Sequence, residues 1–299
     1  MSEQIRRFIL DTDIGPDCDD SAALALALVY ARSCGGKLLG VTHCTSSPWG
    51  VGAIRSILDW YGEGDIPVGT LGEKGFLDKP GMAKYNKALA LTVEPERREA
   101  EDAQKILKEI LEDQPDGSVE LISVGPLKNI GDLISTEEGI DLVGRKVSRL
   151  TMMAGNFSPE CSNPEFNVEM DIRAAQRIAE KWPSELIYCG WEVGAPVVIL
   201  KDKTALKKND PVRMAYELYC GDEGRSSWDL CTVQWAFDPE SPMYSLSRPG
   251  NIEVDDEGYT HFRCDKNGRH FYLSLAASPE KISASLEDDL KIFDAAEND

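Results

Sequence analysis

The residues of this chain best placed to do chemistry form an acidic run near its start. The sequence DTDIGPDCDD, residues 11–20, contains five aspartates: Asp11, Asp13, Asp17, Asp19 and Asp20. Carboxylates held this close repel one another unless protons or a cation neutralise them. A dense set of oxygen ligands suits a hard cation such as Ca²⁺ or Mg²⁺. The run therefore predicts a metal site.

Helix capping explains only part of this run. Asp19 and Asp20 could open the helix that follows, where negative charge interacts favourably with the helix dipole. Asp11 and Asp13 come directly after the apolar segment Phe8-Ile9-Leu10, where capping gives no reason for them. The metal-site interpretation is therefore favoured over a plain acidic loop.

The segments around the acidic run predict a strand, a tight loop and a helix. Phe8-Ile9-Leu10 predicts the strand, Gly15 and Pro16 mark the loop, and the alanine- and leucine-rich residues 21–31 predict the helix. Further strands are predicted at 37–44, 66–71, 118–124, 148–154 and 185–190. Helices are predicted at 51–61, 99–113, from about 128, and at 171–182, 211–220 and 227–237. This alternation predicts an α/β fold with a mostly parallel central sheet flanked by helices.

The last sixty residues have a different pattern. Asp256-Glu257-Gly258 and Lys266-Asn267-Gly268 predict the turns of two consecutive hairpins, and Ser278-Pro279 precedes a final helix over 280–295. The sequence contains no internal repeat and no low-complexity linker. We therefore expect residues 1–299 to form a single Rossmann-like domain with C-terminal hairpins and a C-terminal helix.

Composition restricts the partners of the chain. It has 32 Lys and Arg against 52 Asp and Glu, a formal net charge of -20, which disfavours binding to nucleic acids and anionic membranes. A small neutral or cationic ligand, or a metal, fits better. Eight cysteines without a CxxC pair and three histidines disfavour a zinc site. With no basic-then-apolar leader and no membrane-length apolar run, we expect a cytoplasmic protein with reduced thiols.

Ligands of parallel sheets bind outside the carboxyl ends of the strands. The segments that follow the predicted strands are the aspartate loop, His43 to Trp49, Val124-Gly125, Asn156 to Asn167 and Trp191-Glu192. They contain no Lys or Arg cluster, and the chain has neither GxGxxG nor GxxxxGK[ST]. A nucleotide-phosphate site is therefore disfavoured.

Four segments, in order along the chain, resemble the inosine/uridine-type nucleoside hydrolases. They are 11-DTDIGPDCDD-20, 122-ISVGPLKNI-130, 154-AGNFSPECSNPEFNVEMDIRAA-175 and 227-SWDLCTVQWA-236. The resemblance reaches to about residue 240. It implies an enzyme that cleaves the N-glycosidic bond of ribonucleosides with water, using a bound Ca²⁺, and that forms a homo-oligomer, a dimer or a tetramer.

The resemblance also implies a role for individual residues. The cation would be held by Asp13, Asp20, Asp229 and the backbone carbonyl of Val124, and Asp13 would also be the general base. The ribose hydroxyls would be held by Asp19, Asn156, Glu165 and Asn167. Asp11 would support the loop from behind.

This chain departs from the family pattern at three places. Its loop has two more residues between the glycine and the Asp-Asp pair than the shortest family form, so Asp17 is a competing ligand candidate. Where many members have an Asn after the second strand, it has Thr42-His43-Cys44-Thr45. Trp228 stands where the uridine-accepting branch has a histidine that is thought to protonate the base, which resembles the purine-preferring branch.

The departures at Trp228 and His43 bear on how the leaving base is bound and protonated. We expect a preference for purine ribonucleosides, with Trp228 stacking on the base and Trp49 as the candidate for its opposite face. His43 is the rival leaving-group acid, although a structural role is favoured for it. Trp191 and Trp235 are expected in the core.

The bond between ribose and base breaks through an oxocarbenium-like transition state. Asp13 can accept a proton from the attacking water, and no covalent nucleophile is needed, so inversion at C1′ is expected. One alternative is a phosphatase of the haloacid dehalogenase type, with Asp11 as nucleophile and Asp13 as acid, but the chain lacks a convincing later Lys and Asp-Asp pair. The other is a non-catalytic calcium-binding protein, although no EF-hand loop is present.

Overall fold

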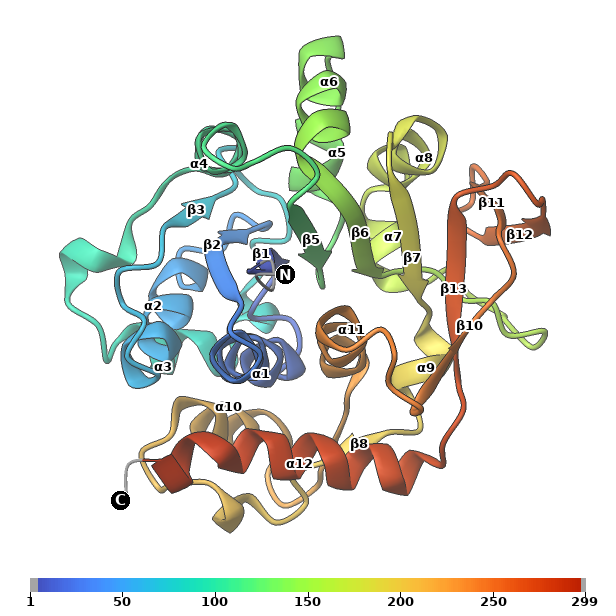
Figure 1. Cartoon of the computed structure of the whole chain (residues 1–299). Coiled ribbons are helices and arrows are strands. Elements are labelled where there is room, and N and C mark those ends of the chain that lie inside the picture. Colours follow the sequence, from blue (N-terminus) through green and yellow to red (C-terminus); the bar gives the residue numbers. More distant parts are fainter. Residues whose placement is uncertain (1–4, 297–299) are drawn as a thin grey trace.

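The structure is a computed structural model that describes residues 5–296. Its centre is a sheet with the strand order β12-β11-β13-β7-β6-β5-β1-β2-β3-β4, and β10 pairs with β13 (Figure 1). Neighbouring strands from β4 to β13 in this order are parallel. The pairs that involve β10, β11 or β12 are antiparallel. The predicted α/β fold with a mostly parallel sheet is confirmed.

The main-sheet strands are β1 (Arg7–Thr12), β2 (Lys37–His43), β3 (Val68–Thr70), β4 (Glu101–Asp102), β5 (Val119–Ser123), β6 (Val147–Met153), β7 (Glu185–Cys189), β10 (Tyr244–Leu246), β11 (Gly250–Val254), β12 (Thr260–Cys264) and β13 (His270–Leu275). A separate antiparallel pair consists of β8 (Val198–Ile199) and β9 (Arg225–Ser226).

The α-helices are α1 (Asp19–Ser33), α2 (Gly50–Trp60), α3 (Asn86–Ala90), α4 (Ala103–Glu112), α5 (Lys128–Leu133), α6 (Glu137–Lys146), α7 (Phe166–Met170), α8 (Ile172–Lys181), α9 (Trp191–Gly194), α10 (Pro211–Cys220), α11 (Trp228–Phe237) and α12 (Pro279–Ala296). Short 3₁₀ helices are η1 (Pro80–Met82), η2 (Pro95–Arg98) and η3 (Lys203–Ala205). Within the described residues, no helix is long and apolar enough to cross a membrane.

Helices cover both faces of the sheet, so both faces of its central strands are buried. Along β1, Phe8 and Leu10 join one apolar cluster and Ile9 joins the other. Helices α1, α2 and α11 lie on the first face, and α4, α5, α6 and α8 lie on the second (Figure 1). Two-sided burial explains why these strands read as continuous apolar runs rather than as alternating ones.

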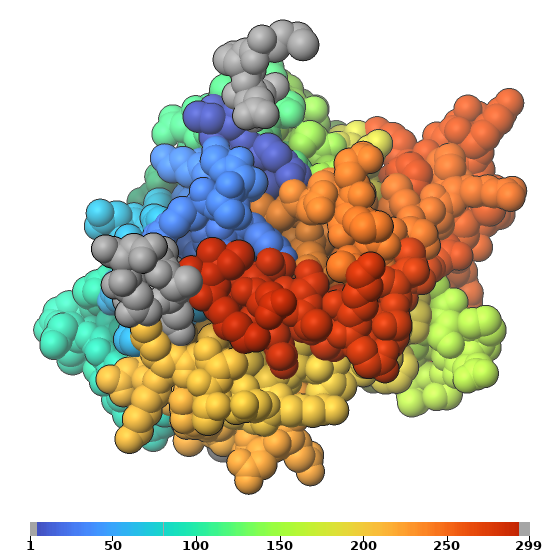
Figure 2. Space-filling view, turned by 60° about the horizontal axis from the view of Figure 1, so that its bottom comes forward, coloured from blue at the N-terminus to red at the C-terminus, as the bar shows by residue number. Residues whose placement is uncertain are grey.

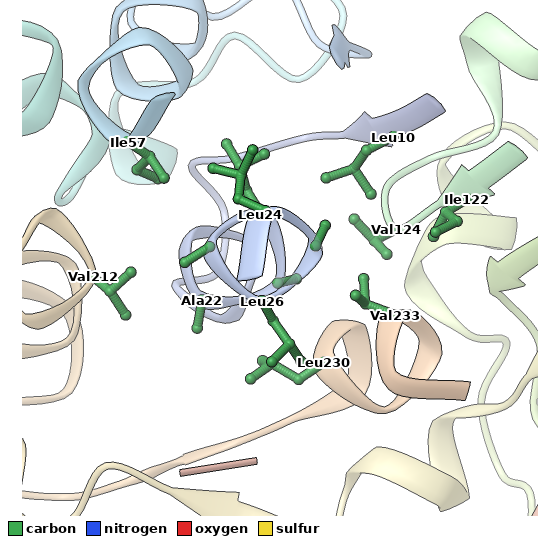
Figure 3. Packing of buried hydrophobic residues seen from close by; sticks show 14 of the residues in the cluster. Leu10, Ala22, Leu24, Leu26, Ile57, Ile122, Val124, Val212, Leu230 and Val233 are labelled. Carbon is green, nitrogen blue, oxygen red and sulfur yellow. The ribbon is translucent and has the colours of Figure 1, made fainter. Parts of the chain in front are cut away.

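Helix α1 lies in the middle of the first face. It packs on α11, α10, α2 and α12, so its side chains are buried almost all round. Figure 3 shows Leu24 and Leu26 of α1 among Leu10, Leu230 and Val212 from neighbouring elements. Because Asp19 and Asp20 form the first turn of α1, this packing fixes the position of their carboxylates.

Helix α12 covers the outer side of α1. Its residues Ile282, Leu286 and Leu290 recur every fourth position and are at most 1% exposed, as expected for a helix that buries one face. Figure 2 shows α12 in red as a strip across this side of the molecule, beside the gold segment that contains α10. The predicted final helix is therefore confirmed.

The tail departs from the prediction at its second hairpin. The turn at 256–258 joins β11 and β12 as expected, and 265–268 also forms a turn. However, β13 pairs in parallel with β7 and meets β11 only at Gly250↔His270. The physical reason is burial: paired with both β7 and β10, β13 buries Leu273 completely, which a free hairpin cannot provide.

Two further elements differ from the prediction. Helix α6 lies between α5 and β6, where no separate helix was predicted. The helix expected at 99–113 begins only at Ala103, because Asp102 caps it by accepting from Gln104 N and Lys105 N, and the two residues before it form β4.

Candidate active site

A pocket opens at the carboxyl ends of the parallel strands. Segments that follow β1, β5, β6 and β7 contribute to it, together with the first turns of α1, α7 and α11 and with β9. Its lining residues are Asp13, Pro16, Asp17, Asp19, Asp20, Val124, Met153, Glu165, Phe166, Asn167, Trp191, Arg225, Trp228 and Asp229. With a volume of about 300 Å³, it is at the small end of the range for small-molecule sites.

Four buried carboxylates meet at the bottom of this pocket. Side-chain oxygens of Asp19, Asp20 and Asp229 lie within 4.8 Å of one another. Asp13 shares a side-chain hydrogen bond with Asp20. All four residues are at most 5% exposed. A segment at the chain start and a helix some two hundred residues later therefore build one acidic cluster.

Burial and mutual repulsion disturb the protonation of these carboxyls. Burial, the largest cause, and the charges of Asp19 and Asp17 together raise the pKa of Asp13 to about 8. The pKa values of Asp20 and Asp229 are raised for the same reasons. Two carboxyls can share a hydrogen bond only if one holds a proton, so at neutral pH the cluster needs protons or a cation.

The donors of the cluster fit a hard divalent cation. Asp19, Asp20 and Asp229, with Asp13 hydrogen-bonded to Asp20, offer only oxygen ligands, which Ca²⁺ prefers, and Val124 lines the same pocket. Among the described residues that line the pocket, Arg225 is the single basic side chain, and it is bound to Asp17. The other carboxylates thus lack a paired protein cation.

The loop between β1 and α1 is held from outside by residues that follow β3. Tyr85 Oη donates to the carbonyl of Asp17 at 2.5 Å, and Asn86 Nδ2 donates to the carbonyl of Ile14 at 3.2 Å. A Cβ at Gly15 would lie 2.4 Å from Asn86 Nδ2, so this close approach requires glycine. Tyr85 and Asn86 thus support the acidic loop from outside.

Asp11 lies behind the pocket rather than in it. Its carboxylate accepts from Thr42 Oγ1 at 2.5 Å and from Asn129 Nδ2 at 2.8 Å. Burial raises the pKa of Asp11 to about 7, and these hydrogen bonds oppose the rise. Asp11 therefore ties β1 to β2 and α5, which agrees with a supporting role.

Two further predicted residues line the pocket but are engaged by the protein. Glu165 caps α7 and accepts from the backbone N–H of Asn167 at 2.8 Å, while burial raises its pKa to about 7. Asn167 Nδ2 donates to the carbonyls of Met153 at 3.0 Å and Val124 at 3.4 Å. Asn156 lies in an adjoining hollow that shares Glu165, and its Oδ1 accepts from Ser158 N.

His43 and Trp49 are placed away from the pocket lining. His43 is fully buried, bonded to Thr45 Oγ1 at 3.0 Å, and burial lowers its pKa to about 4. The ring of Trp49 faces Lys87, whose Nζ lies 5.0 Å from its centroid. A neutral, enclosed imidazole of this kind fits the structural role favoured for His43.

The tryptophans differ from one another in burial. Trp228 lines the pocket from the start of α11, and its Nε1 donates to the carbonyl of Trp191 at 2.9 Å. Trp191 is 47% exposed on the same wall, so the expectation that it packs in the core is wrong. Its place at the start of α9, directly after β7, puts it on the rim. Trp235 is 4% exposed, as expected of a core residue.

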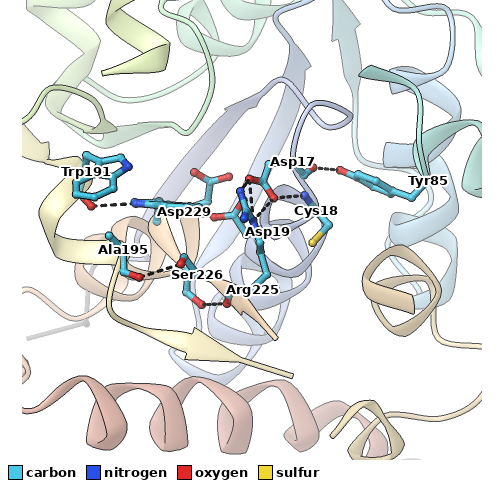
Figure 4. Close-up of polar contacts among 11 residues, drawn as sticks. Asp17, Cys18, Asp19, Tyr85, Trp191, Ala195, Arg225, Ser226 and Asp229 are labelled. Carbon is cyan, nitrogen blue, oxygen red and sulfur yellow. Dashed lines mark hydrogen bonds and ion pairs between the residues drawn. The ribbon is translucent and has the colours of Figure 1, made fainter. Parts of the chain in front are cut away.

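Arg225 is a charged pocket residue that sequence reasoning missed; Pro16, Met153 and Phe166 also line the pocket without having been predicted. Its Nε lies 2.9 Å from Oδ1 and 3.0 Å from Oδ2 of Asp17, and its Nη2 also contacts Asp17 (Figure 4). The same guanidinium lies 5.0 Å from the ring of Trp228. Asp17, the candidate competing ligand, therefore has a partner of its own. The only signal in the sequence is one arginine between acidic residues and the Ser-Trp-Asp segment.

The chain was compared with known proteins. Residues 8–282 match the family model described as inosine-uridine preferring nucleoside hydrolase. The structure resembles an inosine-uridine preferring nucleoside hydrolase from Bacillus anthracis, with 18% identity over 97% of this chain and 99% of that chain and a TM-score of 0.74. It also resembles a purine-preferring ribonucleoside hydrolase from Gardnerella vaginalis, with 18% identity over 96% of this chain and 99% of that chain and a TM-score of 0.74.

A type III effector protein, XopQ, solved with adenosine diphosphate ribose, shares 13% identity over 97% of this chain and 95% of that chain, with a TM-score of 0.74. No curated protein matched the sequence. At these identities the likeness to solved structures shows a common fold.

Proposed function

Because this chain belongs to the inosine-uridine preferring nucleoside hydrolase family, we propose that it hydrolyses the N-glycosidic bond of purine ribonucleosides to ribose and free base, with Ca²⁺ as its cofactor. The observation that carries the proposal is the pocket floor of four buried carboxylates at the carboxyl ends of the strands. Carboxyls whose pKa values are raised by burial and by one another, and that line a pocket, are typical of functional sites.

The cation would be held by Asp13, Asp20, Asp229 and the carbonyl of Val124. When bound, Ca²⁺ would supply positive charge that offsets the carboxylates and open coordination positions for water and sugar hydroxyls. Asp19 lies in the same cluster, so its assignment to the ribose rather than to the cation stays a proposal.

The protein residues would then divide the chemistry between them. Asp13 would take the proton of the attacking water, for which a carboxylate near the reacting carbon is suited. Asp19, Glu165 and Asn167 would hold ribose hydroxyls, with Asn156 reaching them from the adjoining hollow. The buried carboxylates of the pocket would favour the positive charge that develops on the sugar. Water would attack the face opposite the base, with inversion at C1′.

The pocket walls support a purine preference. Trp228 and Trp191 place two indoles on the lining, and base stacking on an aromatic ring contributes roughly 1–3 kcal/mol. Trp191 therefore replaces Trp49 as our candidate for the second aromatic surface. His43, buried and with a pKa of about 4, is poorly suited to protonate a base at neutral pH.

The structure disfavours the alternative of a haloacid-dehalogenase-type phosphatase. It needs Asp11 as an exposed nucleophile, whereas Asp11 is 1% exposed and accepts hydrogen bonds from Thr42 and Asn129.

The family resemblance also supports two proposals about domain organisation and oligomeric state: that the chain is one domain and that it forms a homo-oligomer, a dimer or a tetramer. Limited proteolysis and light scattering measure these.

The experiment is an assay of free ribose released from inosine, guanosine, adenosine, uridine and cytidine. We expect release from the purine nucleosides, loss of activity after chelation, and recovery when Ca²⁺ is restored. Elemental analysis of the purified protein should show Ca²⁺. Release of no base from any nucleoside by the Ca²⁺-loaded protein would refute the proposed function, and a better turnover of uridine than of inosine would refute the purine preference.

A further inference from the structure

Arg225 is held by a carboxylate and by two aromatic rings at once. Its Nε and Nη2 bind the carboxylate of Asp17. Its guanidinium carbon lies 5.0 Å from the ring of Trp228 and 5.4 Å from the ring of Tyr219. A planar cation fixed by a forked carboxylate contact and two aromatic rings has little freedom left, so its remaining donors have a defined place.

The remaining donors include both N–H groups of Nη1. Among the described residues, Nη1 has no hydrogen-bond partner in the protein, whereas Nε and Nη2 are both engaged. Arg225 also lines the pocket, next to Trp228 on the wall assigned to the leaving base. A fixed donor without a protein partner in a ligand pocket is a candidate for ligand recognition.

We propose that Arg225 is a specificity-determining residue that donates from Nη1 to a carbonyl oxygen of the leaving base, so that the enzyme selects 6-oxopurine over 6-aminopurine nucleosides. This inference rests on the proposed function, because it assumes that a purine nucleoside occupies the pocket. An amino group at the same position is itself a donor, and two donors facing each other lose the hydrogen bond and leave an unpaired group.

The same contact assists departure of the base. When the bond between C1′ and N9 breaks, its electron pair stays on the base, and a 6-oxopurine spreads this charge onto its carbonyl oxygen. Arg225 donates hydrogen bonds there without losing a proton. Asp13 takes one proton of the attacking water and the oxygen bonds to C1′, after which a proton returns to the base through solvent. The products are ribose and neutral base.

A purely structural role is the competing explanation, because Arg225 also anchors Asp17 and covers Trp228. Two variants separate the explanations. Arg225→Gln removes Nη1 together with the contact of Nε and Nη2 with the Asp17 carboxylate. Asp17→Asn removes the anchoring charge and keeps an acceptor oxygen and Nη1. Arg213→Gln, which removes a surface partner of Glu217 on α10, is the matched control for loss of an arginine.

The measurement is kcat/KM for inosine and for adenosine in the Ca²⁺-loaded protein. We expect Arg225→Gln to lower the ratio of inosine to adenosine by about 10- to 100-fold, the size expected for one hydrogen bond from a charged donor. Asp17→Asn should lower the ratio less than Arg225→Gln does, because it loosens the guanidinium but keeps Nη1, and Arg213→Gln should change neither value of kcat/KM. An equal loss for both nucleosides in Arg225→Gln, or a larger change of the ratio in Asp17→Asn than in Arg225→Gln, would overturn the proposal.

A second measurement does not depend on turnover. Calorimetric binding of hypoxanthine and adenine to the wild type and to Arg225→Gln should show weaker hypoxanthine binding in the variant and unchanged adenine binding. If inosine is hydrolysed but neither the ratio nor hypoxanthine binding depends on Arg225, the inference fails and the proposed function stands. If no nucleoside is hydrolysed but hypoxanthine binding depends on Arg225, the proposed function fails and base recognition by Arg225 stands.

Discussion

Removal of the cation should make the stability of this protein fall steeply as the pH rises. The perturbation is chelation followed by thermal unfolding between pH 5 and pH 8. In the cation-free protein Asp13, Asp20 and Asp229 must bury their charges against one another, because their pKa values are all raised by burial first and repulsion second. A carboxyl whose pKa is raised on folding stabilises the fold fully below its unfolded pKa and loses that contribution as the pH rises through its folded pKa.

The size of the effect follows from Asp13. Its pKa moves from 3.8 to about 8, about four units, and each unit corresponds to ~1.36 kcal/mol. From pH 5 to pH 8 the scan crosses about three of these units, so the cation-free protein should lose on the order of 4 kcal/mol of stability through this carboxyl. At roughly 2–4 °C per kcal/mol for a chain somewhat smaller than this one, the unfolding midpoint should fall by on the order of 10 °C.

The assay is differential scanning fluorimetry with and without chelator. Saturating Ca²⁺ should remove most of the pH dependence, because bound charge replaces bound protons. The chelated variant Asp20→Asn should melt above the chelated wild type at pH 8, yet gain less from Ca²⁺. Asp141→Asn, at an exposed position of α6, is the control and should change nothing. If the unfolding midpoint of the chelated wild type is constant or rises from pH 5 to pH 8, the buried carboxylates do not destabilise the cation-free fold, and the reasoning is wrong.

Three further predictions concern turnover. Asp13→Asn should keep its fold, judged by circular dichroism, and lose on the order of 10²–10⁴ in kcat or more; turnover within tenfold of the wild type would mean that another residue, such as Asp17, is the base. Asn167→Ala should lower kcat and kcat/KM together in steady-state assays on inosine, because its amide would hold hydroxyls more tightly as the sugar flattens; a change in KM alone contradicts this role. Trp228→Ala should slow inosine hydrolysis more than His43→Ala does when both are stable, and full inosine turnover by Trp228→Ala with loss in His43→Ala would reverse the assignment of the leaving-group role.

The fold was predictable because its signals are local and repeated. Gly-bounded apolar runs such as 37–43 and amphipathic runs such as 103–112 identify their elements without knowledge of the partner. The position of β13 was not predictable in this way. Its residues read equally well as the second arm of a hairpin, and only the apolar surface beside β7, which other segments create, decides the pairing.

In the candidate site, too, residues marked by a local pattern were predictable, and residues that depend on distant contacts were not. Asp13, Asp20 and Asp229 were proposed from the density of carboxylates in one segment and from a motif, and all three line the pocket. Arg225 depends on a contact with Asp17 across 208 positions of sequence, so no local pattern indicates it. Trp191 was misjudged because composition favours burial of an indole, whereas its place at a strand end exposes it.

The way in which α12 covers α1 has a consequence for the order of folding during synthesis. Helix α1 is apolar on nearly every side, and α10, α11 and α12, which cover it, are all made in the last third of the chain. One edge of strand β7 also lacks its pairing partner until β13 has been synthesised. A ribosome-bound chain therefore carries an uncovered apolar helix for most of its translation, a state prone to aggregation. Pairings between such distant segments also slow folding. Recombinant yield should accordingly depend on growth temperature and chaperone supply more strongly than the stability of the finished protein suggests.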